Sequence, residues 1–156
     1  MSRLWGSRRV CCLVVFGALL VGCQDGPTSG APVAGCPDGT VEYLTVADSG
    51  RIRHTDGAFL ELVDRKDQKL IVVDFWAPWC GPCLELAPRL EEIKKDWGNK
   101  IEVVKVDVDK NKPIARHLHV NGIPDVRIFR GGTQVAGFVG SQMAREEIES
   151  LLKSLQ

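Results

Sequence analysis

A pair of cysteines separated by two residues stands between an apolar run and an amphipathic segment, and no other feature limits the possible folds as strongly. The run Leu70–Phe75 is apolar except for one acid, as expected of a strand buried in the centre of a sheet. From Cys83 to Trp97 the apolar residues recur at helical spacing. The pair, Cys80 and Cys83, therefore occupies a strand-to-helix junction, where it can close a small disulfide ring with little backbone movement.

The start of this predicted helix favours a reactive thiolate. The first N–H groups of a helix have no partner within it, and the dipole there is positive. A thiolate at that place is stabilised, so its pKa falls from about 8.5 to about 7 or lower. Cys80 precedes the first turn and is predicted to be the exposed, attacking thiolate. Cys83 would then resolve the mixed disulfide, with Gly81 and Pro82 forming the restricted loop between them.

A metal site, a haem attachment site and a structural disulfide each fit the cysteine pair less well. A zinc site needs four ligands, and the sequence offers neither a second Cys-x-x-Cys nor a nearby Cys/His cluster. Covalent haem attachment needs a histidine after the second cysteine, where this chain has Leu84. A purely structural disulfide is unusual between Trp-rich apolar sequence and a helix start. The pattern predicts redox catalysis that uses the cysteine pair and no metal or other cofactor.

The segment Val73–Cys83 reads Val-Asp-Phe-Trp-Ala-Pro-Trp-Cys-Gly-Pro-Cys and closely resembles the active-site segment of the thioredoxin family. The resemblance implies an α/β thioredoxin fold, with a central mixed five-stranded sheet flanked by four helices, and thiol-disulfide oxidoreductase activity. Gly122-Ile123-Pro124 resembles the family's cis-proline loop, which faces the dithiol. By this resemblance the Ile123 backbone pairs with the substrate strand, and Pro124 suits a cis peptide. Lys105 also falls at the family's usual place.

Several of these residues have a chemical rationale of their own. Asp74 is an acid within an apolar strand, so burial should raise its pKa and make it a candidate proton acceptor for Cys83. The resemblance implies the same role. A structural ion pair with Lys105 is the alternative, and the two roles are compatible. Trp76 and Trp79 fit a core role, but Trp79 stands beside the nucleophile and is better explained as part of the docking surface.

The chain departs from the family pattern at Asp125, where most thioredoxins have threonine. An acid near Cys80 should raise the pKa of that thiolate and disfavour acidic partners. The redox poise and the choice of client are therefore the properties that this departure affects.

The first 22 residues have the features of an export signal. Three arginines precede an uncharged run at residues 10–21, which is too short to span a bilayer. The run ends in Leu20-Val21-Gly22-Cys23, which resembles the bacterial lipobox. This resemblance implies that residues 1–22 are removed and that acyl chains on Cys23 anchor the protein. An ordinary secretory signal with a chance cysteine is the alternative.

Residues 23–47 are predicted as the lipidated cysteine and a flexible linker, followed by a thioredoxin domain at 48–156. The part from 24 to 40 is rich in Gly, Pro, Ser and Ala, with too little apolar surface to pack. Residues 41–46 alternate apolar and polar side chains and predict a short added edge strand. Cys36 lies in the linker, and it either pairs with another molecule or stays free.

Strands and helices alternate in the predicted domain, which implies a mixed sheet covered by helices on both faces. The predicted strands are 52–54, 70–75, 101–106, 126–129 and 134–139, and the predicted helices are 56–64, 83–97, 113–118 and 143–155.

The charge balance limits the partners. The chain has 20 basic and 20 acidic residues and no basic stripe, which argues against nucleic-acid binding. Removal of the signal takes away three arginines and no acid, which leaves 17 basic and 20 acidic residues and a net charge of −3. Attachment to a membrane must then come from the lipid on Cys23.

Together these features predict a membrane-tethered, exported oxidoreductase that reduces protein disulfides in the bacterial envelope. Such a reductase needs a transmembrane thiol donor of electrons as a partner, and we expect it to be a monomer. A Gram-negative source would place it on the periplasmic face of the outer or inner membrane, and any other source on the outer face of the plasma membrane. An envelope oxidase or isomerase, and a non-catalytic docking subunit of the same fold, are the alternatives.

Overall fold

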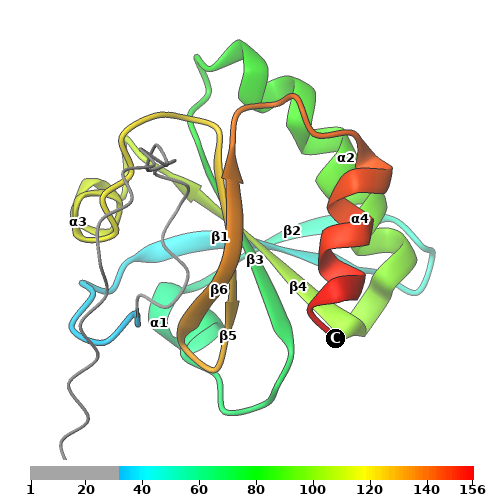
Figure 1. Cartoon of the computed structure of the whole chain (residues 1–156), viewed down its shortest axis with the longest axis horizontal. Helices are drawn as coiled ribbons and strands as arrows, with labels where there is room; N and C mark the ends of the chain where they lie inside the picture. The colour runs from blue at the N-terminus through cyan, green and yellow to red at the C-terminus, as the bar shows by residue number, and fades with distance from the viewer. Residues whose placement is uncertain (1–31) are drawn as a thin grey trace, which may run out of the picture.

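The computed structural model describes residues 32–156, in which helices cover both faces of a mixed six-stranded sheet (Figure 1). The strand order is β2-β1-β4-β3-β5-β6. In chain order the elements are β1 (Thr40–Val46), β2 (Ile52–Ala58), α1 (Phe59–Val63), β3 (Leu70–Trp76), α2 (Gly81–Trp97), the 3-10 turn η1 (Gly98–Lys100), β4 (Ile101–Asp107), α3 (Lys112–His117), β5 (Asp125–Arg130), β6 (Thr133–Val139) and α4 (Arg145–Ser154).

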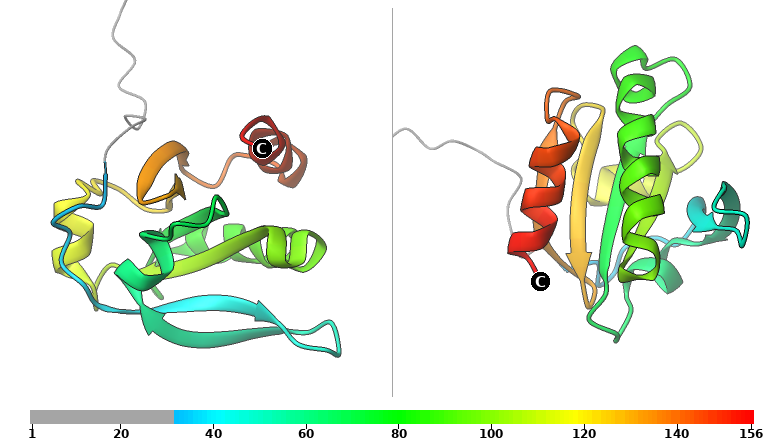
Figure 2. Two further views of the ribbon diagram at one scale, coloured as in Figure 1. Left: turned by 90° about the horizontal axis from the view of Figure 1, so that it is seen from below. Right: turned by 90° about the vertical axis from the view of Figure 1, so that its right-hand side faces the viewer.

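The helices lie in pairs on opposite faces of the sheet, α2 with α4 and α1 with α3 (Figures 1 and 2). Leu86 of α2 and Ile148 of α4 share one buried cluster with Val72 of β3. Phe59 of α1 and Ile114 of α3 belong to a second cluster on the other face. The thioredoxin fold expected from the sequence is therefore confirmed: helices pack on both faces of a mixed sheet.

The strand that leads to the cysteine pair is buried in the middle of the sheet. β3 runs parallel to β4 on one side and antiparallel to β5 on the other. Every residue of the run Leu70–Phe75 is buried, because both faces and both edges of this strand are covered. The predicted central strand is confirmed, and its end at Trp76 fixes where α2 can begin.

The N-terminal strand is not at the edge of the sheet, so the prediction of an edge strand over 41–46 is wrong in its position. β1 pairs with both β2 and β4, which leaves β2 as the edge and gives six strands instead of five. The physical reason is that β1 buries a side chain on each face. Val41 joins the cluster on the α1 and α3 face, and Leu44 joins the one under α2 and α4.

The strand β2 is longer than the sequence indicates. Its pairing with β1 is unbroken from Val46↔Ile52 to Thr40↔Ala58. The helix predicted over 56–64 therefore begins only at Phe59. Continuous cross-strand pairing outweighs the local helical spacing over these three positions.

Part of the predicted flexible linker packs on the domain. Val33 and Cys36 are buried within the cluster on the α1 and α3 face. The N–H of Val33 donates to the carbonyl of Gly132, 2.8 Å away, in the β5–β6 turn. Average composition does not show that these two apolar side chains are buried against the domain, so the prediction of a flexible linker is wrong for residues 32–39. The predicted signal and Cys23 lie outside the described residues.

The remaining elements lie close to their predicted positions. Helices α2, α3 and α4 each begin within two residues of the expected start. The predicted hairpin between β5 and β6 is present, and Gly131 and Gly132 at its tip have φ of 55° and 73°. Two central residues of positive φ match the right-handed twist of the paired strands. Between residues 32 and 156, the helices are all too short or too polar to cross a bilayer.

If β1 belongs to the cooperative core, Leu44→Ala should lower the free energy of unfolding by about 2–5 kcal/mol, because it removes a fully buried side chain. Val46→Ala, at the 37% exposed end of the same strand, is the matched control and should cost less than about 1 kcal/mol. Urea unfolding of both variants measures the difference. Equal costs would show that β1 lies outside the cooperative unit.

Candidate active site

The cysteine pair lies where β3 passes into α2. The N–H of Cys80 donates to the carbonyl of Ala77 (3.1 Å), which closes a tight turn after the strand. Cys80 is the N-cap of α2, and its Sγ accepts from the N–H of Cys83 at 3.2 Å. Proline at the helix start is compatible with the unpaired first turn, and Pro82 stands there. The strand-to-helix junction predicted from the sequence is confirmed.

The two cysteines form a disulfide, with Cα atoms 5.3 Å apart. Cys80 is 5% exposed and Cys83 1% exposed. The expectation of an exposed Cys80 is therefore wrong for this oxidised form, because Cys80 belongs to a small buried cluster with Ala77, against which Ile123 packs. Gly81 and Pro82 between the cysteines are exposed. Of the two sulfur-bearing residues, Cys80 is still the one nearer to solvent.

The start of α2 provides a favourable electrostatic setting for a thiolate at Cys80. No acidic residue occupies the first turn of this 17-residue helix. The unpaired N–H groups and the positive end of the dipole therefore act on the N-cap sulfur without an opposing charge in that turn. Reduction of the disulfide would leave a thiol whose ionised form is stabilised there.

Asp74 lies on the central strand with no contact to solvent. Neither of its carboxylate oxygens has a hydrogen-bond partner within residues 32–156. Burial raises the pKa of Asp74 to about 6, against the attraction of Lys105, whose Nζ lies 3.6 Å from Oδ2. Because side chains alternate along a strand, Asp74 shares the face of Val72, which packs under α2. The carboxyl group thus lies on the side of the sheet from which the cysteines approach.

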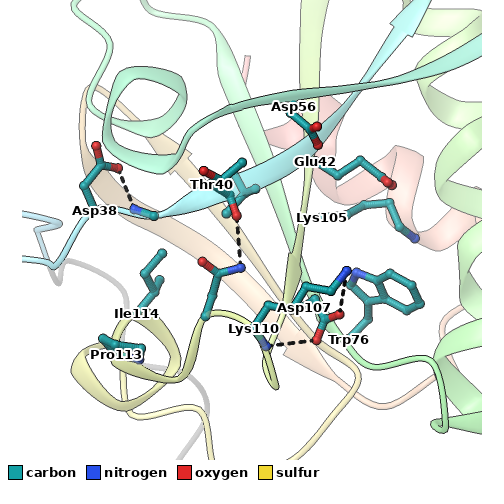
Figure 3. A pocket seen from close by; sticks show the side chains of 13 residues that line it. Asp38, Thr40, Glu42, Asp56, Trp76, Lys105, Asp107, Lys110, Pro113 and Ile114 are labelled. Carbon is teal, nitrogen blue, oxygen red and sulfur yellow. Dashed lines mark hydrogen bonds and ion pairs between the residues drawn. The ribbon is translucent and has the colours of Figure 1, made fainter.

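Lys105 connects this buried carboxylate to a pocket of about 460 Å³ (Figure 3). Its Nζ lies 4.7 Å from the centre of the Trp76 ring, in a cation–π contact. Glu42 of β1 also lines the pocket and pairs in register with Lys105. Asn111, which also lines the pocket, donates to the carbonyl of Thr40 at 3.1 Å. The N-terminal strand therefore shapes the surroundings of the lysine that faces Asp74.

The loop before β5 lies against the disulfide. The Ile123–Pro124 peptide bond is cis, as the sequence predicts, and the Ile123 side chain packs on the cluster that contains both cysteines. The N–H of Gly140 donates to the carbonyl of Pro124 at 2.8 Å, which ties the loop to the end of β6. The structure therefore brings the predicted docking loop and the cysteine pair together.

Trp79 stands out from the surface next to Cys80. Its side chain is 69% exposed, and its Nε1 donates to Oδ2 of Asp109 at 2.7 Å. Asp107 holds Asp109 in turn, because its Oδ1 accepts from the Asp109 N–H at 2.9 Å. Sequence reasoning missed Asp109, since no local signal links residues 30 positions apart. The ring offers a large apolar surface of fixed orientation beside the reactive sulfur.

Asp125 does not act as a free negative charge near the nucleophile. It is buried, and its carboxylate pairs with Arg127, with Nη2 2.7 Å from Oδ2 and Nε 3.1 Å from Oδ1. The expected penalty for acidic partners therefore loses its basis, because the charge is compensated within the fold. Asp125 instead helps to raise the pKa of Asp74, after the larger effects of burial and Lys105. Sequence reasoning missed Arg127, although a charge within an apolar strand was a signal.

Cys36, the remaining cysteine of residues 32–156, is buried and free. Burial, and secondarily the charge of Asp38, raise the pKa of its thiol. A buried thiol that resists ionisation is a poor nucleophile, which favours the unpaired alternative over a bond to another molecule.

A disulfide that can open and re-form at the start of a helix defines the class of thiol-disulfide oxidoreductases. The thioredoxin family model matches residues 51–154. Thioredoxin 1 of Nostoc sp. is 44% identical over 87 residues, which cover 56% of this chain and 80% of that protein. Thioredoxin of Bacillus subtilis is 36% identical over 101 residues, 65% of this chain and 93% of its own length.

The solved structures include similar folds. Fasciola hepatica thioredoxin superposes with a TM-score of 0.52 at 34% identity, over 57% of this chain and 83% of that one. This chain belongs to the thioredoxin family. Its exchange reaction uses the Cys80–Cys83 disulfide as the redox group and needs no cofactor. Between residues 32 and 156, no three His, Cys, Asp or Glu side chains gather in a way that could hold a metal ion.

The predicted role of Asp74 as proton acceptor has a kinetic consequence. Asp74→Asn should slow release of the mixed disulfide by about 10²–10⁴-fold, because an amide cannot accept the proton of Cys83. The wild-type release rate should fall as the pH drops through about 6, where Asp74 becomes protonated, and the variant should lack this step. Stopped-flow turnover of a protein disulfide from pH 5 to 8 measures both. Unchanged turnover would remove Asp74 from the mechanism.

The same variant has a stability consequence with a defined sign. Because folding raises the pKa of Asp74 from 3.8 to about 6, the folded wild type loses stability as the pH rises through this range, by up to about 3 kcal/mol. Asp74→Asn should therefore be at least as stable as wild type at pH 8 and lose its advantage near pH 4. Asp48→Asn, at the exposed β1–β2 turn, is the control for denaturation and turnover.

Proposed function

We propose that this chain is a lipid-anchored thioredoxin that reduces protein disulfides in the envelope of a bacterium. The Cys80–Cys83 disulfide at the start of α2, on the side of the sheet that bears the buried Asp74 carboxylate, carries the redox part of the proposal. The sequence Leu20-Val21-Gly22-Cys23 after an uncharged run supports the anchor.

The first step uses Cys80 as the nucleophile of the reduced protein. Its thiolate attacks one sulfur of a client disulfide, the client S–S bond breaks, and one client thiolate leaves. Its place at the N-cap of α2 and its greater exposure than Cys83 support this assignment. Trp79, Gly81 and Pro82 form the exposed surface around it, on which the client would dock.

The second step uses Cys83 and Asp74. Asp74 takes the proton of the Cys83 thiol, and the resulting thiolate attacks Cys80 Sγ. The mixed disulfide breaks, the Cys80–Cys83 disulfide forms, and the second client sulfur leaves as a thiolate that is then protonated. Two electrons pass to the client. A carboxyl group with a pKa of about 6 is ionised at neutral pH and can accept the proton.

The client strand would bind to the cis-proline loop. An extended peptide gains affinity mainly from main-chain hydrogen bonds, and Ile123 lies against the disulfide cluster. Its backbone would pair with the client next to the scissile bond. Trp76 and Lys105 contact each other through a cation–π interaction and would help to fix the structure around the site.

The reduced state must be restored by another thiol. The Cys-Gly-Pro-Cys loop is that of thioredoxin, whose reduction potential is about −270 mV, whereas a strong thiol oxidant lies at about −120 mV. An envelope reductase therefore needs electrons from the cell interior, and a transmembrane thiol donor is the partner that we propose. Export places the protein where disulfides form and persist.

The reduction potential and the capture of clients test the direction of electron flow between this protein and its clients. We expect equilibrium with glutathione or dithiothreitol buffers to give a potential near about −270 mV. Cys83→Ser should stall the mixed disulfide on Cys80, and the captured envelope proteins can be identified by mass spectrometry after non-reducing electrophoresis. Cys80→Ser with Cys83→Ser is the control and should capture nothing. A potential near about −120 mV would indicate an oxidase. Retention of the biological role by the double variant would indicate a docking subunit.

The anchor is tested by Cys23→Ala in the full-length protein. We expect the variant to leave the membrane fraction, because the mature chain has a net charge of −3 and does not bind anionic lipids by charge. Fractionation at low and high salt, with Cys36→Ala as the matched control, measures the change. Retention of Cys23→Ala in the membrane fraction at high salt would contradict lipid anchoring and leave the redox assignment untouched.

A further inference from the structure

Arg127 contacts both ends of the segment that contains the cis-proline loop. At the entry to this segment its Nη1 donates to the carbonyl of Leu118, and its Nη2 reaches the carbonyl of His119 at 3.5 Å. At the exit, its Nε and Nη2 bind the two oxygens of Asp125 at 3.1 and 2.7 Å. One guanidinium therefore bridges the last residues of the α3 region and the first residue of β5.

The loop between these ends has few fixed points of its own. The N–H of Val120 donates to Ala115 at 2.9 Å, and the carbonyl of Pro124 accepts from Gly140 at 2.8 Å. Residues 121–123 make no backbone–backbone hydrogen bond within the described part of the chain. The position of Ile123 over the disulfide therefore depends on how the two ends are held relative to each other.

The guanidinium of Arg127 can hold the two ends of the loop together better than another cation could. Its planar donors act in fixed directions, so one group can bind a carboxylate in bidentate fashion and still reach two carbonyls. Its Cζ also lies 5.6 Å from the centre of the Phe75 ring, next to Asp74 on β3. The buried charge is compensated by Asp125, without which it would be strongly destabilising. The two residues form a unit that joins α3, β3 and β5.

We propose that Arg127, together with Asp125, is a positioning residue that holds the docking loop 120–124 in place over the Cys80–Cys83 disulfide for protein substrates. Within the described residues its hydrogen bonds go to Leu118, His119 and Asp125 and not to either cysteine. A protein disulfide that pairs with Ile123 depends on the loop, whereas a small disulfide meets mainly Cys80. This role rests on the docking of clients at Ile123 proposed above and is the same for either direction of electron flow.

The test compares two substrates in each variant. Asp125→Asn with Arg127→Met removes the bridge without leaving a buried unpaired charge. The readout is kcat/KM for a protein disulfide, insulin, divided by kcat/KM for a small disulfide, 5,5′-dithiobis(2-nitrobenzoate). The same ratio measured for Asp74→Asn gives the part of any change that comes from the Asp74 carboxyl group alone. Arg130→Met is the matched control, because Arg130 lies on the same strand and donates to Leu155 at the C-terminal end of α4.

We expect the ratio to fall about tenfold in the double variant, through a higher KM for insulin, since a displacement of 1 Å can cost about 100-fold. Arg127→Lys should fall between the double variant and wild type, and Arg130→Met should match wild type. Amide exchange over residues 120–123 should be faster only in the Arg127 variants. An unchanged ratio in a folded double variant overturns the proposal. If that variant does not fold, a ratio for Arg127→Lys within twofold of wild type overturns it.

Discussion

Asp74 sits on the central strand, out of contact with water, and the active end of the molecule is built around this buried carboxylate. Its ionised form would be very costly in an apolar sheet without a nearby cation. β4 supplies that cation as Lys105, at 3.6 Å, and the parallel pairing of β3 with β4 sets this distance. Burial raises the pKa of Asp74 and Lys105 lowers it, and the result is a pKa of about 6. A carboxyl group with this pKa can exchange protons at physiological pH.

The surroundings of this carboxylate include two further charges that compensate each other. Asp125 on β5 raises the pKa of Asp74, and Arg127 holds Asp125 in a bidentate pair. The same arginine also binds the carbonyls of Leu118 and His119, so it contacts both a charge that acts on Asp74 and the entry to the docking loop. Substitutions at this pair therefore act on binding and proton transfer together, and only a comparison of substrates separates them.

The N-terminal segment is part of the folded domain. Its strand β1 lies between β2 and β4, and its residue Glu42 lies opposite Lys105 in the register of β1 with β4. The N–H of Val33 donates to the carbonyl of Gly132 in the β5–β6 turn. The family model matches residues 51–154, so β1 and the segment before it lie outside the matched region. Pro32 forms an isolated bridge with Thr133 of β6, so the described part of the chain begins beside the β5–β6 hairpin.

Local features of the sequence determined the parts of this protein that depend on neighbours along the chain. The apolar run before Cys80, the proline at the helix start and the paired glycines at 131–132 each specify their own backbone geometry, so the junction, α2 and the hairpin were predictable. The acid within an apolar strand likewise indicated a perturbed carboxyl group at position 74.

Only the tertiary structure decided which distant segments meet. The place of β1 inside the sheet, the cover over Cys36, the bond from Trp79 to Asp109 and the neutralisation of Asp125 all join residues whose proximity follows from strand order or from packing. Periodicity and composition report how each segment could bury its own apolar side. They do not report which partner covers it, because that choice depends on the free energy of the whole assembled core.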